Sequence, residues 1–464
     1  MPLLDQMANA WRIRDLRHKI LITLGLLALC RVGVFIPLPD ISVEALSAQF
    51  QRTADGLGVL GLLNLFTGGA LGRGALFALG IMPYITASII FTLLSNVIPS
   101  LEALRREGAA GQRKLNQYMR LTTVGICLFQ GTFLLRTIMS PQVVHAGVLD
   151  TPLGTVGFLV KGAFLLTAGT LFLMWLGEQI DQHGIGNGIS MIIMVNILAR
   201  LPNAIYMLQR QIELADSQQN AILKIIALLA LFVAMVVAIV FITRGERRIP
   251  VQQQKHVRGP KVYGGQKHYL PLKVNTAGVL PIIFASVLLQ FPQMISRWAA
   301  NESTPGGFWY RFFGTISDAL GPGGQGGISL SYMILYGMLI FFFCYFWTAV
   351  VFNPREMSEN LQNHGSFIPG IRPGRRTAAY LEGIMNRVTM AGAFFLLVVA
   401  LMPAFVATGL NVEYTAASFM GGTSILIVVG VTLDLVRRIS DHLEMRRYSG
   451  FAAGSGGRRR SRRR

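Results

Sequence analysis

The sequence has little charge for its length. Only 14% of its 464 residues are Asp, Glu, Lys or Arg, against about 25% in an ordinary soluble domain. Apolar residues make up 52% of the chain, and the mean hydropathy is +0.50. A chain this apolar and this aromatic is not intrinsically disordered. The shortage of charge also argues against a soluble globular protein.

Cysteine and catalytic signatures are scarce as well. The three cysteines, Cys30, Cys127 and Cys344, each lie inside an apolar run, and their odd number and spacing exclude a disulfide scaffold or a zinc site. The sequence has no Walker A motif, no His-Glu-x-x-His and no Gly-x-Ser-x-Gly. Asp181 and His183 are close together but have no further ligands beside them. We therefore expect no enzyme, no cofactor and no metal.

Ten apolar runs have the length that membrane helices need. A helix needs about 20 apolar residues to cross a hydrocarbon core of about 30 Å. The runs are 20–36, 75–98, 121–140, 155–176, 187–208, 221–243, 274–296, 328–352, 384–408 and 416–436. The first run follows basic residues as a signal peptide does. It is long and has no small-residue cleavage site, so we expect a retained helix.

Basic residues are distributed unevenly between the connections. Ten spans place both termini on one side, and that side, including segment 1–19 and tail 437–464, holds 31 Lys and Arg against seven on the other. By the positive-inside rule the basic side is cytoplasmic. Connections 243–273 and 353–376 are long and basic, so we expect binding loops there. The Arg-rich end of the tail predicts contact with anionic lipid or RNA phosphate.

An internal repeat divides the runs into two halves, 20–208 and 221–436. Ala78–Ile90 and Thr276–Leu288 lie 198 residues apart and share five of thirteen positions, including a Gly and a Pro. Five helices per half mean that the second half enters from the opposite side. The pattern therefore predicts an inverted repeat with a path between the halves. Chance similarity between two apolar helices is the alternative.

The segment Gly56–Gly74 is apolar but too short to span. Seven of its nineteen residues are glycine, and Leu57–Phe66 makes only about 15 Å of helix. Irregular backbone at membrane depth must be enclosed by protein or water. The segment therefore suits a re-entrant plug at about 57–74. A helix lying on the membrane surface is the equal alternative.

Eight motifs carry a family resemblance over about residues 10–445. They are Leu63–Ala70, Ala78–Ile90, Phe172–Gln179, Gly184–Ser190, Leu272–Asn275, Phe352–Glu356, Phe367–Gly374 and Gly421–Ile425. On these motifs the chain resembles the SecY family, the large subunits of bacterial protein-conducting channels. The resemblance implies an all-α polytopic membrane protein with ten transmembrane helices in two inverted halves of five and a re-entrant plug helix. It also implies passive conduction of unfolded secretory polypeptides and lateral release of hydrophobic segments into lipid.

The resemblance also implies four sets of site residues. The pore ring is Ile81, Ile85, Ile189, Ile193, Ile283 and Ile427. The plug, with its body over Leu60–Leu71, includes Leu60, Leu62, Leu63, Asn64, Phe66 and Leu71. The lateral gate, between the second and seventh helices, includes Thr86, Ser88, Gln130, Asn187, Ser286 and Gln290. Docking of a motor or ribosome is carried by Arg258, Lys261 and Arg372.

Physical reasoning supports the ring independently. Ile81 and Ile85 are four residues apart and share one helix face, as do Ile189 and Ile193. β-Branched side chains are stiff, and a ring of them excludes ions by dewetting. Ordinary helix packing is the alternative for any single isoleucine. At the docking loop the family often has two adjacent arginines, where this chain has Pro260 and Lys261, so only Lys261 is carried over, with Arg258 as a substitute.

The implied partners are the small membrane subunits SecE and SecG, the SecA ATPase, the ribosome with its RNA and proteins, preproteins bearing signal sequences, and anionic lipid. The implied location is the bacterial cytoplasmic (inner) membrane, with both termini cytoplasmic. A small-solute transporter and an intramembrane hydrolase are the rival classes. A transporter needs ionisable residues at mid-span, whereas Arg31, Arg387 and Asp434 lie near span ends.

Overall fold

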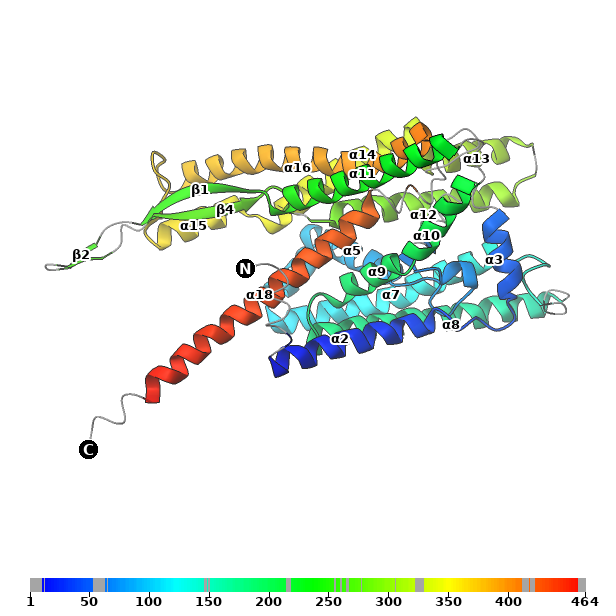
Figure 1. Cartoon of the computed structure of the whole chain (residues 1–464), viewed down its shortest axis with the longest axis horizontal. Helices are drawn as coiled ribbons and strands as arrows, with labels where there is room; N and C mark the ends of the chain where they lie inside the picture. Colours follow the sequence, from blue (N-terminus) through cyan, green and yellow to red (C-terminus); the bar gives the residue numbers. More distant parts are fainter. Residues whose placement is uncertain are drawn as a thin grey trace.

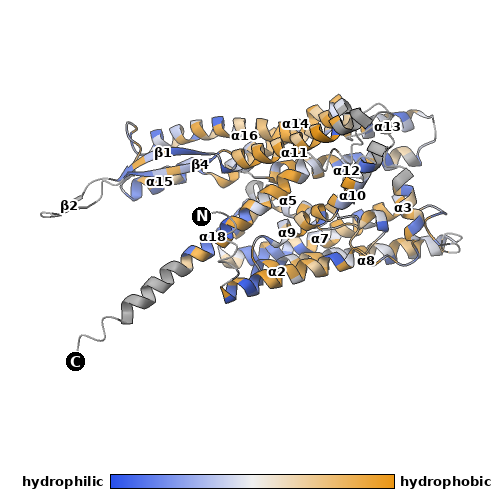
Figure 2. Ribbon diagram, viewed as in Figure 1, coloured by the Kyte–Doolittle hydropathy of each residue, from blue (hydrophilic) through white to orange (hydrophobic). Residues whose placement is uncertain are grey.

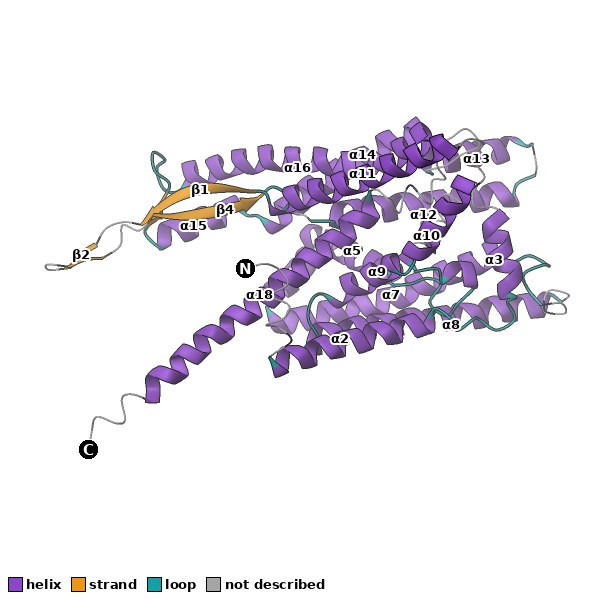
Figure 3. Ribbon diagram, in the orientation of Figure 1, coloured by secondary structure: helices purple, strands orange, loops and turns teal. Residues whose placement is uncertain are grey.

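The structure is a computed structural model of the whole chain. It describes residues 11, 13–52, 63–64, 66–145, 148, 151–213, 218–253, 256–258, 261–263, 267–276, 278–304, 306–321, 329–410, 417 and 422–457. Helices dominate these residues, and a small sheet lies at one end of the molecule (Figure 3).

Each of the ten predicted runs contains a long helix. The N-terminal half holds α2 (Arg14–Gly33), α5 (Met82–Val97), α7 (Ala109–Ile138), α8 (Pro152–His183), and the consecutive α9 (Gly188–Leu198) and α10 (Leu201–Glu213). The C-terminal half holds α11 (Gln218–Arg244), α12 (Leu280–Glu302), α14 (Leu330–Val351), α16 (Arg375–Leu410) and α18 (Thr423–Gly457). Shorter helices α3 (Val43–Arg52), α6 (Pro99–Arg106), α13 (Phe308–Leu320), α15 (Pro354–Asn363) and the 3-10 turn η1 (Leu71–Arg73) connect them.

Among the described residues, seven helices are long and apolar enough to cross a membrane by themselves. α5 and α6 are long and apolar enough only when they are taken together, and they bend by 99° relative to each other. The bend falls at Ile98, which is extended because a following proline disfavours helical backbone. The other two predicted spans are α2 and α18, whose apolar stretches have charged residues at their ends.

Several helices extend beyond the apolar runs that predicted them. α7 begins at Ala109 rather than near residue 121, and α16 begins at Arg375 rather than near 384. α18 continues to Gly457, so the first part of the predicted tail 437–464 is helical. The Arg458–Arg464 run lies outside the described residues. Hydropathy marks only the lipid-facing part of a helix, because polar turns continue the same backbone geometry into water.

The two halves form two layers (Figure 1). One layer contains α11, α12, α14 and α16, the other contains α2, α7 and α8, and α18 runs diagonally across. The layers meet where α5 contacts α12 and where α9 contacts α18. Apolar residues fill the middle of the helices and polar residues gather toward their ends (Figure 2). This is the pattern expected of helices that lie in lipid.

The two basic loops fold together, which the sequence did not predict. β1 (Glu246–Gln253) pairs antiparallel with β4 (Lys267–Lys273) and also with β5 (Ser366–Phe367), in the order β4-β1-β5. Ile249 and Val251 alternate with exposed residues on β1 and pack against Leu381 of α16. The hairpin of β2 (His256–Arg258) and β3 (Lys261–Tyr263) projects beyond this sheet (Figure 1).

Candidate functional site

The six isoleucines of the predicted ring, which we call the collar, all belong to or pack against the largest hydrophobic cluster of the described residues, and this cluster also includes residues of α2, α8, α11, α14 and α16. Ile81 precedes α5, and the others lie on α5, α9, α12 and α18, so both halves contribute. Five of them are between 2 and 8% exposed, and the half-buried Ile189 packs against the same cluster. Residues at or on four helices, from both halves, therefore share one apolar core.

The described part of the predicted plug is a compact turn held by its own hydrogen bonds. Asn64 accepts hydrogen bonds through Oδ1 from the Gly72 N–H (3.0 Å) and through its carbonyl oxygen from the Gly69 N–H (2.9 Å). Phe66 belongs to the same large hydrophobic cluster as the collar isoleucines, and Leu71 is 1% exposed. These residues are enclosed by protein, which favours the re-entrant interpretation over a surface helix. Leu60 and Leu62 lie outside the described residues.

Arg31 reaches the plug from α2, a contact that the sequence did not predict. Its Nη1 lies 3.4 Å from both the Gly68 carbonyl oxygen and Asn196 Oδ1. Gly68 has a φ of +66°, and a Cβ there would lie 2.5 Å from Arg31 Nη1. Only glycine therefore fits between Arg31 and Asn196 in this conformation. The available sequence signal was an arginine within the apolar run 20–36.

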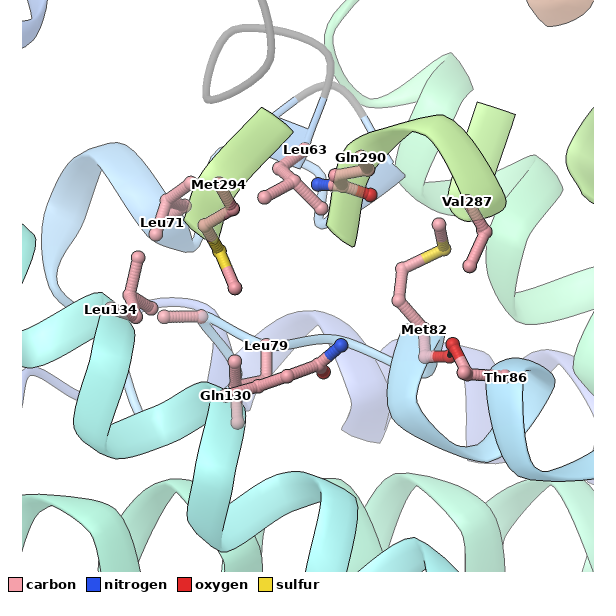
Figure 4. Close-up of a pocket in the computed structure, with 11 residues that line it drawn as sticks. Leu63, Leu71, Leu79, Met82, Thr86, Gln130, Leu134, Val287, Gln290 and Met294 are labelled. Atoms are coloured by element: carbon pink, nitrogen blue, oxygen red, sulfur yellow. Dashed lines mark hydrogen bonds between the residues drawn. The ribbon is translucent and has the colours of Figure 1, made fainter. Parts of the chain in front are cut away.

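A small cavity joins the plug to the predicted lateral gate. Figure 4 shows three polar side chains around it, Thr86 of α5, Gln130 of α7 and Gln290 of α12. The cavity volume is about 30 Å³, enough for a water molecule or two. Its other walls are Leu63, Leu71, Ala78, Leu79, Met82, Leu134, Val287 and Met294. We call this space the gate pocket, because α5, α7, α12 and the plug meet in it.

The remaining predicted gate residues lie outside the residues that line this pocket. The Ser286 hydroxyl donates to the Ile283 carbonyl of its own helix (2.8 Å), and Ser88 is half-buried on α5. Asn187 is exposed and caps α9, accepting a hydrogen bond from the Ser190 N–H at 3.0 Å. In this structure the Asn187 side chain serves the backbone of its own helix, and its role at the gate stays a prediction.

The predicted docking residues lie on the two basic loops, 243–273 and 353–376. Arg372 is exposed in the turn between β5 and α16. Its carbonyl accepts from the Thr377 hydroxyl (3.0 Å), and the nearby Gly374 carbonyl accepts from the Ser358 hydroxyl (2.7 Å), so the turn is held in place. Arg258 and Lys261 are paired across the β2–β3 hairpin. Lys261 and Arg258, which we expect to substitute for the family's second arginine, are therefore neighbours.

Comparison with known sequences gives consistent results along the chain. The sequence model of the SecY family matches residues 75–436. The protein translocase subunit SecY of Synechocystis is 43% identical over 448 residues, covering 96% of each chain. The protein translocase subunit SecY of Thermotoga maritima is 41% identical, again covering 96% of each chain.

Comparison with solved structures shows the same fold at low sequence identity. A structure described as a protein conducting channel has a TM-score of 0.62 and 18% identity, covering 92% of both chains. Sec61 in the canine ribosome-channel complex of the endoplasmic reticulum has a TM-score of 0.57 and 17% identity, with the same coverage. The ten-helix polytopic fold that the sequence predicts is confirmed.

Proposed function

The chain belongs to the SecY family, and we propose a passive mechanism for it in which the collar, the plug and the gate pocket each have a distinct task. It is a multi-pass membrane protein and a subunit of a protein-conducting channel. In our proposal unfolded secretory polypeptides pass through the collar. Hydrophobic segments leave sideways between α5 and α12.

The observation that carries the proposal is that six isoleucines from both halves and Phe66 of the plug belong to one apolar core. A narrow apolar constriction repels water, and ions do not cross it without their hydration shells. Isoleucine offers no polar atom that binds a particular sequence, so chains of any composition can pass. The stiffness of β-branched side chains keeps the ring narrow around them.

The plug closes the collar at rest. Its turn is held by hydrogen bonds that Asn64 accepts from the Gly69 and Gly72 N–H groups, whereas Arg31 of α2 reaches the Gly68 carbonyl at the longer distance of 3.4 Å. Because these hydrogen bonds lie within the turn, the turn leaves as a unit when a polypeptide enters. It reseats when the polypeptide has passed.

The lateral gate is opened by the hydrophobic segment itself. Interhelical hydrogen bonds in membranes contribute only about 0.6 kcal/mol each. A Leu, Ile or Val at the centre of a helix contributes about 0.3 to 0.6 kcal/mol to insertion, so ten of them supply several kcal/mol. A signal segment therefore competes with the contacts of the gate pocket, whereas a polar segment does not.

The energy for translocation comes from partners that bind the channel. We assign the hydrolysis of ATP to the SecA motor, and the chain itself carries no catalytic role. Arg372, Arg258 and Lys261 form the docking surface for SecA or the ribosome, since arginine pairs with carboxylate or phosphate bidentately. The ribosome-bound Sec61 structure supports this side of the proposal. SecE, SecG and anionic lipid complete the complex in the bacterial inner membrane, with both termini cytoplasmic.

A stalled preprotein tests the path. A photoreactive residue replaces Ile85, Ile283 or, as the control, Phe164, which is 62% exposed on α8. We expect crosslinks to the stalled chain from both collar positions and none from Phe164. Crosslinks confined to Phe164 would overturn the central path.

A further inference from the structure

Four side chains join α7 to α12 beyond the gate pocket. The Arg136 Nη2 donates to Glu302 Oε1 at 2.8 Å. The Arg136 guanidinium carbon also lies 5.6 Å from the centre of the Trp298 ring. The Phe133 ring meets Trp298 edge to face, with 6.3 Å between ring centres. We call these four residues the outer clasp.

The outer clasp follows from helical spacing on both partners. Phe133 and Arg136 are three residues apart on α7, and Trp298 and Glu302 are four apart on α12. Each helix therefore presents one aromatic and one charged side chain on a single face. The Trp298 ring lies against the Arg136 guanidinium and Glu302 pairs with it, while both charged side chains stay about half exposed. The two helices are thus joined by an ion pair, a cation–π contact and an aromatic contact.

The position of the outer clasp relates it to lateral release. Gln130 and Leu134 of α7 line the gate pocket, and Arg136 follows them toward the end of that helix. Gln290 and Met294 of α12 line it too, with Glu302 at the end of α12. α7 belongs to the N-terminal half and α12 to the C-terminal half. The outer clasp therefore closes the same seam as the gate pocket, at its outer end.

We propose that the outer clasp determines specificity, because it sets how hydrophobic a segment must be before the seam opens. This inference rests on the proposed lateral release. A segment entering lipid must separate these four residues whatever its own sequence. None of the three contacts between them involves the segment, so the energy needed to break them is the same for every segment. Weakening the clasp therefore lowers the required hydrophobicity by a constant amount. The release curve moves along the hydrophobicity axis without changing its slope.

The test uses model preproteins whose 19-residue segments carry increasing numbers of Leu in an Ala background. The complete channel complex is reconstituted in vesicles, and the fractions released into lipid and translocated are measured for each segment. The variants are Glu302→Gln and the charge swap Arg136→Glu with Glu302→Arg. Arg120→Gln is the matched control. Arg120 also lies on α7 and pairs with Glu178 at 2.6 Å, but Glu178 is on α8 of the same half.

The midpoint is the number of Leu residues at which half of the segments are released into lipid. We expect Glu302→Gln to lower this midpoint by about one to two Leu. The charge swap restores the ion pair but not the contact of Arg136 with Trp298, so it should return the midpoint part of the way to the wild-type position. Arg120→Gln should leave the midpoint unchanged. Equal midpoints for wild type and Glu302→Gln, or an equal shift in Arg120→Gln, would overturn the outer clasp while lateral release stands. A wild-type channel that releases no segment into lipid would instead overturn the proposed function, and the clasp inference with it.

Discussion

Replacing Gly68 by alanine should unseat the plug. Gly68 has a φ of +66°, and its added Cβ would lie 2.5 Å from Arg31 Nη1 and 3.0 Å from Asn196 Oδ1. A non-glycine residue in left-handed conformation costs about 1–2 kcal/mol. Displacing Arg31 from the Gly68 carbonyl removes a hydrogen bond of about 1 kcal/mol. The seated plug is therefore destabilised by about 2–3 kcal/mol.

Such a loss has a measurable consequence. Because 1.4 kcal/mol is tenfold in an equilibrium constant, the ratio of unseated to seated plug rises by about 30- to 140-fold. The assay is the ion conductance of resting channels in planar bilayers. Gly25→Ala on α2 is the control, because a Cβ there meets nothing within 4 Å.

We expect Gly68→Ala to raise the resting conductance and Gly25→Ala to leave it at the wild-type level. Adding Arg31→Ala to Gly68→Ala restores neither the relaxed backbone nor the Arg31 hydrogen bond, so the conductance should stay at the raised level. If Gly68→Ala conducts no more than wild type at rest, the reasoning that close packing against Arg31 seats the plug is refuted.

Three further predictions concern the collar, the turn that carries Arg372, and the sheet β4-β1-β5. Replacing Ile85 and Ile283 together by Asn should raise resting ion leakage in bilayers by wetting the constriction, and unchanged conductance would remove the collar assignment. Arg372→Glu should weaken motor or ribosome binding about tenfold or more without loss of membrane insertion, whereas Arg311→Glu on α13 should not; normal binding by the Arg372 variant would show that docking occurs elsewhere. Ile249→Ala, at a position 2% exposed, should destabilise the sheet by about 2–5 kcal/mol, measured as faster proteolysis within 246–273, and equal cleavage rates would contradict this packing.

Hydropathy predicts the helices because lipid forces each span to be apolar over a fixed length. It does not predict where a helix ends in water, as α7, α16 and α18 show, because polar residues continue a helix equally well. The sheet was not predictable from local pattern. β5 has only two residues and pairs with β1 across more than a hundred residues of chain, so no periodicity marks it.

The candidate site was also only partly predictable from the sequence. The i,i+4 spacing of Ile81 and Ile85 was visible, and the glycines of 56–74 predicted irregular backbone. Contacts between distant segments were not visible. Arg31 meets Gly68 and Asn196, and Arg136 meets Glu302 at a separation of 166 residues. A charge in an apolar run signals that a partner exists, but only the packing of the two halves identifies it.

The helix α18 has a mechanical consequence. It carries Ile427 in the collar and continues unbroken to Gly457, about 45 Å further at 1.5 Å per residue. Because the helix is uninterrupted, a movement of its far end also moves the part that carries Ile427. A partner that binds that end can therefore shift one wall of the constriction.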